Sequence, residues 1–145
     1  CLIIGDSRRG LKDWPTIIYK MNADELTQLT GESTDPSDPS ETASKLARQT
    51  GQPVFVSLNE AGIVGADANG NVEQLPALPI IGEIDIVGAG DAVMANLTTA
   101  LAAGAELNEA LELANAAASV VIHKLGTTGA ASLTEIKNLI ANQLN

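Results

Sequence analysis

Hydrophobic residues recur along the chain in two spacings, short continuous runs and the longer period of a helix, and the two kinds of segment alternate. Short runs bounded by turn residues predict buried strands, whereas the longer period predicts helices with one buried face. The strands predicted in this way are 2–4, 17–19, 54–58, 63–65 and 72–75. The predicted helices are 23–30, 40–50, 89–103, 108–124 and 133–144.

Residues that favour helix ends set several of these boundaries. Gly31 and Gly51 follow the last periodic residues of two helices, where a left-handed residue commonly ends a helix. Ser40 is the expected N-cap of the second helix, and Ser132 with Glu135 forms a capping box at the start of the last one. The helix boundaries indicated by the capping residues therefore agree with those indicated by the spacing of hydrophobic residues.

The order of the elements predicts an α/β layered domain with a mainly parallel sheet flanked by helices. A Gly/Asn turn at 67–71 predicts one hairpin within it. We expect residues 1–145 to form a single domain, with Asp6, Ser57 and a glycine-rich segment at the carboxyl ends of the strands, where such sheets bind ligands. Because the chain opens directly on an apolar strand, we also expect it to be a fragment whose N-terminal portion is absent.

Composition narrows the classes of function. Eighteen acidic residues outnumber eight basic ones, and the net charge of −10 disfavours binding to nucleic acid or anionic lipid. One cysteine and one histidine cannot supply a tetrahedral zinc site or an internal disulfide. No segment has the length and apolarity of a membrane span, so a cytoplasmic location is expected.

The segment 85–91, Asp-Ile-Val-Gly-Ala-Gly-Asp, precedes an alanine-rich helix and carries the most specific chemistry. Its glycines allow the N–H groups of Gly88, Ala89 and Gly90 to converge on an anion at a helix N-terminus, beside the carboxylate of Asp91. The plainer alternative is a glycine-containing helix start in which Asp91 complements the helix dipole.

Five short motifs occur together in one order, and this order carries a resemblance. They are Asn22-Ala-Asp-Glu25, Ser57-Leu-Asn-Glu60-Ala-Gly62, the segment 85–91, Ala114-Asn115-Ala-Ala-Ala118 and Lys124-Leu-Gly126-Thr127. In order and rough spacing the chain resembles the C-terminal half of ribokinase-like (PfkB-type) carbohydrate kinases, over nearly all of its length. Within them it looks most similar to the sugar kinases of the bacterial heptose pathway.

This resemblance implies a ribokinase-like fold whose N-terminal half, with the sugar-binding groups, is absent. It implies transfer of the γ-phosphoryl group of ATP to a sugar hydroxyl, with ATP and Mg²⁺ as cofactors and K⁺ as a further candidate. Asp91 then acts as the general base, and the amides of Gly88, Ala89 and Gly90 hold the developing charge. Two alternatives stay open: a non-catalytic nucleotide-binding module and a scaffold domain.

The same resemblance assigns the remaining motifs. Asn22 and Glu25 organise Mg²⁺ and phosphate, with Glu25 acting through water, although Asn-x-x-Glu is equally a helix capping box. Asp85 helps to hold a monovalent cation, but Ile86 replaces the usual threonine there, and an aspartate that accepts loop N–H groups is the simpler interpretation.

Ser57, Glu60 and Gly62 are expected near the nucleotide phosphates and ribose, with a simple hairpin turn as the alternative. Asn59 stands where the family more often has glycine.

Asn115 and Ala118 are expected to border the adenine. Close packing of a helix face formed by Ala114, Ala117, Ala118 and Val121 explains the alanines equally well. The expected partners are thus a nucleotide and a sugar. A homodimer formed through parts outside the chain stays open, and the sequence does not identify the sugar.

Overall fold

The computed structural model describes residues 1–143, and the chain groups into two compact units, Cys1–Pro76 and the part from Ala77 onward. The first unit contains β1 (Ile4–Gly5), β2 (Ile18–Asn22), α1 (Ala23–Thr30), α2 (Ser40–Thr50), β3 (Val54–Ser57), the 3₁₀ turn η1 (Asn59–Ala61), β4 (Ile63–Ala66) and β5 (Val72–Leu75). The second unit contains α3 (Ala89–Ala102), α4 (Leu107–Ile122) and α5 (Leu133–Gln143). That both units belong to one domain stays a prediction.

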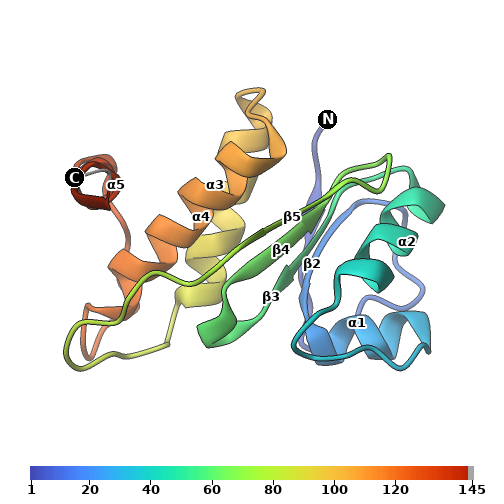
Figure 1. The fold of residues 1–145 in the computed structure, drawn as a ribbon, viewed down its shortest axis with the longest axis horizontal. Coiled ribbons are helices and arrows are strands. Elements are labelled where there is room, and N and C mark those ends of the chain that lie inside the picture. Colours follow the sequence, from blue (N-terminus) through green and yellow to red (C-terminus); the bar gives the residue numbers. More distant parts are fainter. Residues whose placement is uncertain (144–145) are drawn as a thin grey trace. The chain divides into compact units, whose positions relative to one another are not determined.

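The strands of the first unit form one sheet in the order β1-β2-β3-β4-β5 (Figure 1). The pairs β1–β2 and β2–β3 are parallel, whereas β3–β4 and β4–β5 are antiparallel. Helices connect β2 to β3, but only short turns connect the last three strands, and a short turn permits antiparallel pairing alone. The α/β layered fold is confirmed, with a mixed sheet whose parallel part comes first.

Helices α1 and α2 lie on the same side of this sheet (Figure 1). Their inward residues Leu26 and Ala47 pack with Met21 of β2 and Val56 of β3, and all four side chains are fully buried. Burial of each large apolar side chain contributes roughly 1.5–3 kcal/mol. This cluster forms the core that holds the carboxyl ends of the parallel strands in place.

The predicted ends of α1 and α2 are confirmed where glycine sets them. Gly31 and Gly51 have φ angles of 70° and 65°, and each donates its N–H to a carbonyl of the last turn. The prediction that Ser40 caps α2 is wrong, because Ser40 is the first helical residue and the N-cap is Pro39. The N–H of Ser40 donates instead to Oδ1 of Asp38 at 3.2 Å.

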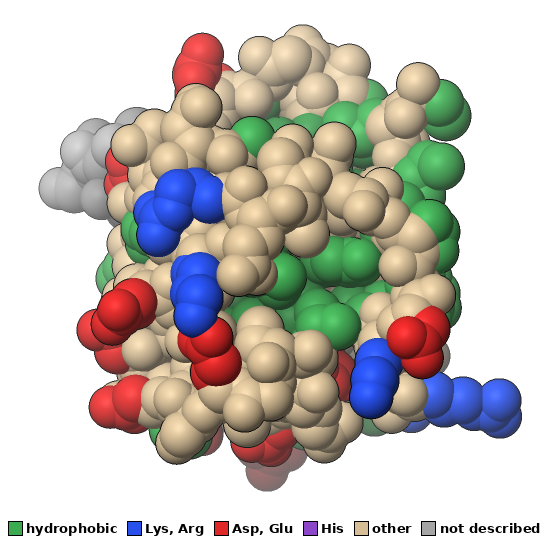
Figure 2. Space-filling model, turned by 90° about the vertical axis from the view of Figure 1, so that its right-hand side faces the viewer, with side chains coloured by type: hydrophobic (Ala, Val, Ile, Leu, Met, Phe, Trp, Pro, Cys, Tyr) green, Lys and Arg blue, Asp and Glu red, His purple; other side chains and the backbone are tan. Residues whose placement is uncertain are grey.

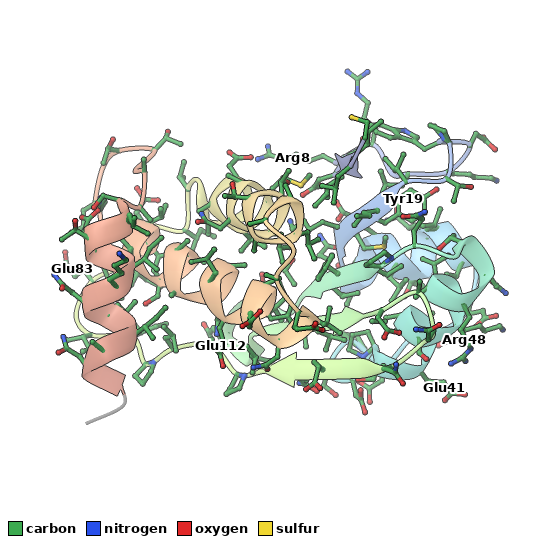
Figure 3. The ribbon with its side chains drawn as sticks, turned by 90° about the horizontal axis from the view of Figure 1, so that it is seen from above. Arg8, Tyr19, Glu41, Arg48, Glu83 and Glu112 are labelled. Atoms are coloured by element: carbon green, nitrogen blue, oxygen red, sulfur yellow. The ribbon has the colours of Figure 1, made fainter. Side chains whose placement is uncertain are left out.

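The turn between β4 and β5 is held from two sides. Oδ1 of Asp67 accepts the N–H groups of Asn69 and Asn71 at 2.8 and 2.9 Å. Hydrogen bonds from Asn71 and Asn69 lower the pKa of the Asp67 carboxyl. From α2, the hydroxyl of Ser44 donates to the carbonyl of Gly70 at 2.6 Å and accepts from Arg48. The side chain of Arg48 is labelled in Figure 3. The predicted hairpin is therefore confirmed, and a hydrogen bond connects its turn to α2.

In the second unit, α3 and α4 lie side by side (Figure 1). The face of α4 that carries Ala110, Ala114 and Ala117 is fully buried, and such small side chains allow neighbouring helices to approach closely. Helix α4 begins one residue earlier than predicted, at Leu107, because Glu106 is its N-cap and forms a capping box with Glu109. The predicted last residue of α5, Leu144, lies outside the described residues.

The predicted capping box at α5 is confirmed. Oε2 of Glu135 accepts the N–H of Ser132 at 2.8 Å, and Oγ of Ser132 accepts the N–H of Glu135 at 3.3 Å. Nζ of Lys124 lies 2.8 Å from Oε1 of the same carboxylate. The hydrogen bonds from Lys124 and then Ser132 lower the pKa of Glu135 to about 2.

The charged side chains visible on one face are interspersed, acidic beside basic, with hydrophobic side chains between them (Figure 2). One exposed ion pair, Lys45 with Glu32, joins α2 to the loop before it. Within residues 1–143, no helix combines the length and apolarity that a membrane crossing requires.

Candidate active site

In the first unit, the carboxyl ends of three parallel strands meet at one edge of the sheet. Strand β1 ends at Gly5 and is followed by Asp6, β2 ends at Asn22, and β3 ends at Ser57. Asn22 and Ser57 are register partners, so their side chains belong to the same row of the sheet. The hydroxyl of Ser57 donates to the carbonyl of Met21 at 3.3 Å. The structure thus brings together two motifs that are 35 residues apart in sequence (57 − 22).

Asn22 and Glu25 form a complete capping box at the start of α1. Oδ1 of Asn22 accepts the N–H of Glu25, and Oε2 of Glu25 accepts the N–H of Asn22, both at 2.8 Å. The alternative interpretation of this motif, a helix capping box, is therefore correct. It occupies only one oxygen of the half-buried Glu25 carboxylate, and among the described residues Oε1 has no hydrogen-bond donor. The second oxygen remains available to a ligand or to metal-bound water.

Residues 58–62 form the loop of the β3–β4 hairpin, as the structural alternative predicts. The N–H of Leu58 donates to the carbonyl of Gly62 at 2.8 Å. Asn59 has a φ of 52°, a left-handed conformation that glycine adopts freely and asparagine tolerates best among other residues. Asparagine at position 59 therefore fits this backbone. Glu60 is exposed, and Gly62 has a φ of 104° and a ψ of −133°, which a side chain would strain.

The glycine-rich segment lies in the second unit and ends at the N-cap of α3. Gly88 is this N-cap, with a φ of 86°, and a Cβ atom there would lie 3.0 Å from Cγ2 of Thr128. The carbonyl of Gly88 accepts the first helical hydrogen bond, from Ala92, at 2.9 Å. Both backbone conformation and available space therefore require glycine at this position.

The N–H groups at this helix start differ in whether they donate a hydrogen bond within the protein. The N–H of Ala89 donates to the carbonyl of Ile86 at 3.2 Å, so the prediction that it is a free anion donor is weakened. Among the described residues, no acceptor is recorded for the N–H groups of Gly88, Gly90 and Asp91. Such unpaired donors at a helix N-terminus, with the positive end of the helix dipole, suit an anion.

The side chain of Asp91 stands in the first turn of α3. It is exposed, and no described residue donates a hydrogen bond to its carboxylate. A carboxylate here stabilises the helix through the dipole, as the plainer alternative states. The same exposure leaves its oxygens free to accept a proton from a bound hydroxyl.

Asp85 orders the segment that leads to these groups. Its Oδ1 accepts the N–H of Val87 at 3.0 Å, and its Oδ2 accepts the N–H of Gly126 at 3.3 Å. Its own N–H donates to the carbonyl of Ile122 at 2.7 Å. Asp85 therefore accepts N–H groups of the loops, as the simpler interpretation states.

His123, at the end of α4, contacts the loop that precedes α3. Its Nδ1 lies 2.6 Å from the carbonyl oxygen of Ser119, and its Nε2 accepts the N–H of Ile81 at 3.2 Å. This pair of contacts requires the neutral ring with the proton on Nδ1. Among the described residues, no three His, Cys, Asp or Glu side chains gather as a metal site, and both ring nitrogens of His123 lie at hydrogen-bonding distance from backbone groups.

Helix α4 carries the two residues expected at the adenine. The buried face includes Ala114, Ala117 and Val121, whereas Asn115 and Ala118 are half-buried neighbours on its flank. The packing explanation is thus confirmed for the buried face. Contact of Asn115 and Ala118 with a nucleotide stays a prediction.

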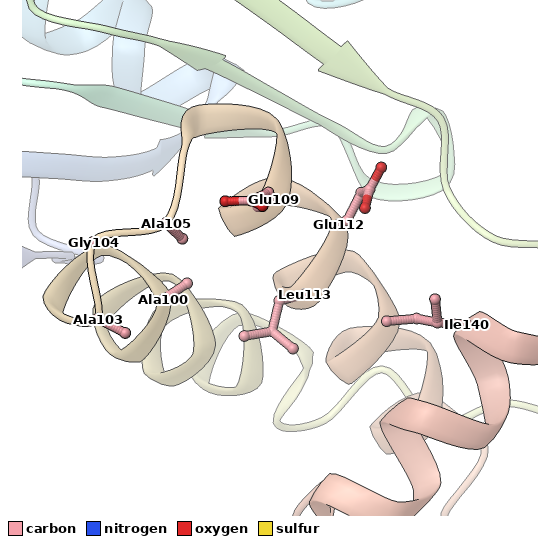
Figure 4. Close-up of a pocket in the computed structure, with 8 residues that line it drawn as sticks. All are labelled: Ala100, Ala103, Gly104, Ala105, Glu109, Glu112, Leu113 and Ile140. Atoms are coloured by element: carbon pink, nitrogen blue, oxygen red, sulfur yellow. The ribbon is translucent and has the colours of Figure 1, made fainter.

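A cavity of about 490 Å³ lies elsewhere in the second unit, at the junction of α3 and α4 (Figure 4). Its lining includes Ala100, Gly104, Glu109 and Ile140. Because α3 rises about 1.5 Å per residue, Ala100 lies about 14 Å along the helix from Asp91. This cavity is therefore separate from the glycine-rich segment.

One charged group at the sheet edge was not among the predicted site residues. Lys20 of β2 is buried, and its Nζ lies 2.7 Å from Oδ2 of Asp6. The signal in the sequence was a lysine directly after an apolar run, Ile17 to Tyr19, in a strand that was predicted to end too early.

Comparison with known proteins agrees with this arrangement. A family profile described as pfkB family carbohydrate kinase matches residues 10–134. The chain belongs to this family. It is 39% identical over 108 residues to the bifunctional protein HldE of Paramagnetospirillum magneticum, an alignment that covers 73% of the chain and 22% of HldE. The chain thus spans about a quarter or less of that relative.

Solved structures of two kinases from Escherichia coli have the same fold. Phosphofructokinase-2 of Escherichia coli in complex with potassium matches with a TM-score of 0.76 and 28% identity, over 88% of this chain and 41% of that one. A protein described as ribokinase II from E. coli, in complex with ATP and Mg²⁺, matches with a TM-score of 0.74 and 25% identity, over 86% and 39%. The ribokinase-like fold, as a partial fold, is confirmed.

Proposed function

We propose that this pfkB-family chain carries the nucleotide site, the anion-binding amides and the catalytic base of an ATP-dependent kinase that phosphorylates a hydroxyl of a sugar or sugar derivative. The observation that carries the proposal is the helix start at α3, where Gly88 and Gly90 present unpaired N–H groups beside the exposed carboxylate of Asp91. Family membership supplies the reaction class.

In this proposal Asp91 accepts the proton of the attacking hydroxyl. General-base assistance of this kind typically accelerates a reaction by roughly 10²–10⁴-fold. The N–H groups of Gly88 and Gly90 stabilise the negative charge of the transferring phosphoryl group, each contributing about 3 kcal/mol if well aimed. The αL conformation of Gly88 directs this helix start, and the hydrogen bonds of Asp85 hold the loop before it.

The nucleotide is assigned to the residues that the family resemblance named, namely Asn22, Glu25, Ser57, Glu60, Gly62, Asn115 and Ala118. The donor set fits Mg²⁺, which is usually held by one or two carboxylates together with waters and substrate phosphates, and Oε1 of Glu25 is such an oxygen. When bound, Mg²⁺ neutralises charge on the phosphate oxygens. Glu25 would orient a metal-bound water while Asn22 keeps the carboxylate fixed.

Asp85 has two roles in the proposal. The first is the ordering of the loop through its N–H acceptors. The second is a contribution to a K⁺ site, because each carboxylate oxygen has lone pairs left after accepting one N–H. Replacement of K⁺ by a larger organic cation at constant ionic strength tests the second role without altering the first.

The acceptor is proposed to be a sugar of the kind used in the heptose pathway, because the chain's motifs resemble the kinases of that pathway and its relatives include HldE proteins. We place the reaction in the cytoplasm, where ATP is available. A homodimer formed through parts outside the chain is compatible with this proposal. The competing function is a nucleotide-binding or interaction module that has the fold without the activity.

The substitution Asp91→Asn tests the catalytic role. The side chain keeps its size but loses its basicity, so phosphoryl transfer to a panel of sugars by the full-length gene product should fall by at least roughly a hundredfold. ATP affinity measured by calorimetry should change little. Unchanged activity of the variant, or the absence of phosphorylated sugar with the unsubstituted protein, would falsify the catalytic proposal and favour the binding module.

A further inference from the structure

The side chain of Lys124 connects the loop between α4 and α5, residues 123–132, to the start of α5. Its Nζ donates to the carbonyl of Ala130 at 2.5 Å and lies 2.8 Å from Oε1 of Glu135. Glu135 belongs to the capping box of α5, and the hydrogen bond from Lys124 is the largest cause of the low pKa of its carboxyl. The ammonium therefore holds the last part of the α4–α5 loop to a capped helix end.

The aliphatic part of the same side chain packs against the loop at Gly129. A Cβ atom at Gly129 would lie 2.8 Å from Cδ and 3.0 Å from Cβ of Lys124. Carbon atoms that are not bonded to each other pack best at about 3.5–4.0 Å, so a side chain at this position would force the two apart. Gly129 is not among the glycines with a positive φ, so crowding by Lys124, rather than backbone conformation, opposes a side chain here.

The α4–α5 loop also contacts the glycine-rich segment at two points. The N–H of Gly126 donates to Oδ2 of Asp85 at 3.3 Å. A Cβ atom at Gly88 would lie 3.0 Å from Cγ2 of Thr128, so the loop and the N-cap of α3 are in close contact. Gly126 and Thr128 both lie between Lys124 and the loop residues that it holds. A displacement of the loop would therefore change the surroundings of the N–H groups that start α3.

We propose that Lys124 is a positioning residue for the helix start that binds phosphate. It fixes the conformation of the α4–α5 loop, and the loop in turn holds the segment 85–88 through Gly126 and Thr128. This inference rests on the proposed kinase function. Two explanations oppose it: the ammonium of Lys124 contacts the phosphate directly, or its ion pair stabilises the fold and has no effect on phosphate binding.

Calorimetry with ATP and Mg²⁺ on the full chain separates these explanations with three variants. Lys124→Met removes the ammonium and should weaken ATP binding by about three- to thirtyfold, the range typical of residues that act on a site through their neighbours. Gly129→Ala keeps the charge of Lys124 but crowds its aliphatic part, so it should displace the loop and weaken ATP binding to a similar extent. Lys137 is exposed on α5, so Lys137→Met changes the net charge equally and should leave the ATP affinity nearly unchanged.

The opposing explanations give different results. A direct contact with phosphate predicts that Lys124→Met weakens ATP binding while Gly129→Ala does not. A purely stabilising ion pair predicts a lower free energy of unfolding in Lys124→Met with the ATP affinity of the unsubstituted chain. Either result overturns the inference, and so does a loss of affinity in Gly129→Ala alone.

Circular dichroism checks that each variant is folded before titration. If Lys124→Met is unfolded, Lys124→Gln takes its place, because it also removes the charge. If Gly129→Ala is unfolded, Thr128→Ala takes its place, because it removes the contact of the loop with Gly88 and keeps the charge. The same losses of ATP affinity are expected from these replacements.

Failure of the broader proposal has a different signature. If the unsubstituted chain binds no ATP, the kinase function proposed above fails, and the role of Lys124 fails with it. If the unsubstituted chain binds ATP and both Lys124→Met and Gly129→Ala bind it equally well, only the role of Lys124 is wrong.

Discussion

The substitution Gly88→Ala tests how the glycine-rich segment is built. Two effects oppose a side chain at this position, a φ of 86° and a contact of 3.0 Å between the added Cβ and Cγ2 of Thr128. A left-handed conformation costs an alanine roughly 1–2 kcal/mol. Overpacking against a neighbour adds about 1–3 kcal/mol. We therefore expect Gly88→Ala to lower the free energy of unfolding by about 2–5 kcal/mol.

Gly104→Ala is the matched control. Gly104 has nearly the same φ, 84°, but a Cβ there would meet no atom within 4 Å. Its substitution should therefore cost the conformational part alone, roughly 1–2 kcal/mol. Removal of Cγ2 in the double variant Gly88→Ala with Thr128→Ala should recover most of the difference between the two single glycine variants.

Urea denaturation followed by far-ultraviolet circular dichroism measures these differences, because the second unit consists of α3, α4 and α5. Trp14, the sole tryptophan, belongs to the first unit and would report on that unit instead. If Gly88→Ala and Gly104→Ala destabilise the chain equally, or if Thr128→Ala gives no recovery, the proposed packing of Gly88 against Thr128 is refuted.

Three further predictions concern other parts of the chain. Glu135→Gln removes the carboxylate that Lys124 stabilises. Because the pKa of Glu135 in the folded chain is lowered to about 2, the unsubstituted chain should be more stable than the variant above about pH 5. This difference in the free energy of unfolding should vanish as the pH falls towards 2. Asp67→Ala removes acceptors for Asn71 and should destabilise the β4–β5 turn by about 1 kcal/mol in urea titrations, and no change would contradict the turn's role. Asn22→Ala should cost about 1 kcal/mol of stability and also weaken ATP binding in calorimetry; loss of stability alone would show a capping role only.

Local signals in the sequence predicted much of the fold, because interactions between neighbouring residues determine where the helices end. Gly31 and Gly51 ended their helices as predicted, since a left-handed residue stops a helix regardless of tertiary context. Ser40 failed as a cap because Asp38 and Pro39 take the positions before α2, and serine patterns do not distinguish a cap from a first helical residue.

The features that sequence reasoning missed are tertiary. The pairing of Lys20 with Asp6 depends on parallel β1 and β2 placing residues 14 positions apart side by side. The requirement for glycine at position 88 arises partly from Thr128, 40 residues away (128 − 88). The engagement of the Ala89 amide by Ile86 is likewise a property of the folded turn rather than of the motif.

The measurement that tests the central claim most directly is a ¹H–¹⁵N NMR titration of the chain with ATP and Mg²⁺. The account predicts downfield shifts of the amide protons of Gly88 and Gly90, because both N–H groups acquire a phosphate acceptor, while the amide of Gly104 stays in place. Saturation of the chain with ATP without any shift at Gly88 and Gly90 would contradict the claim that this helix start binds phosphate.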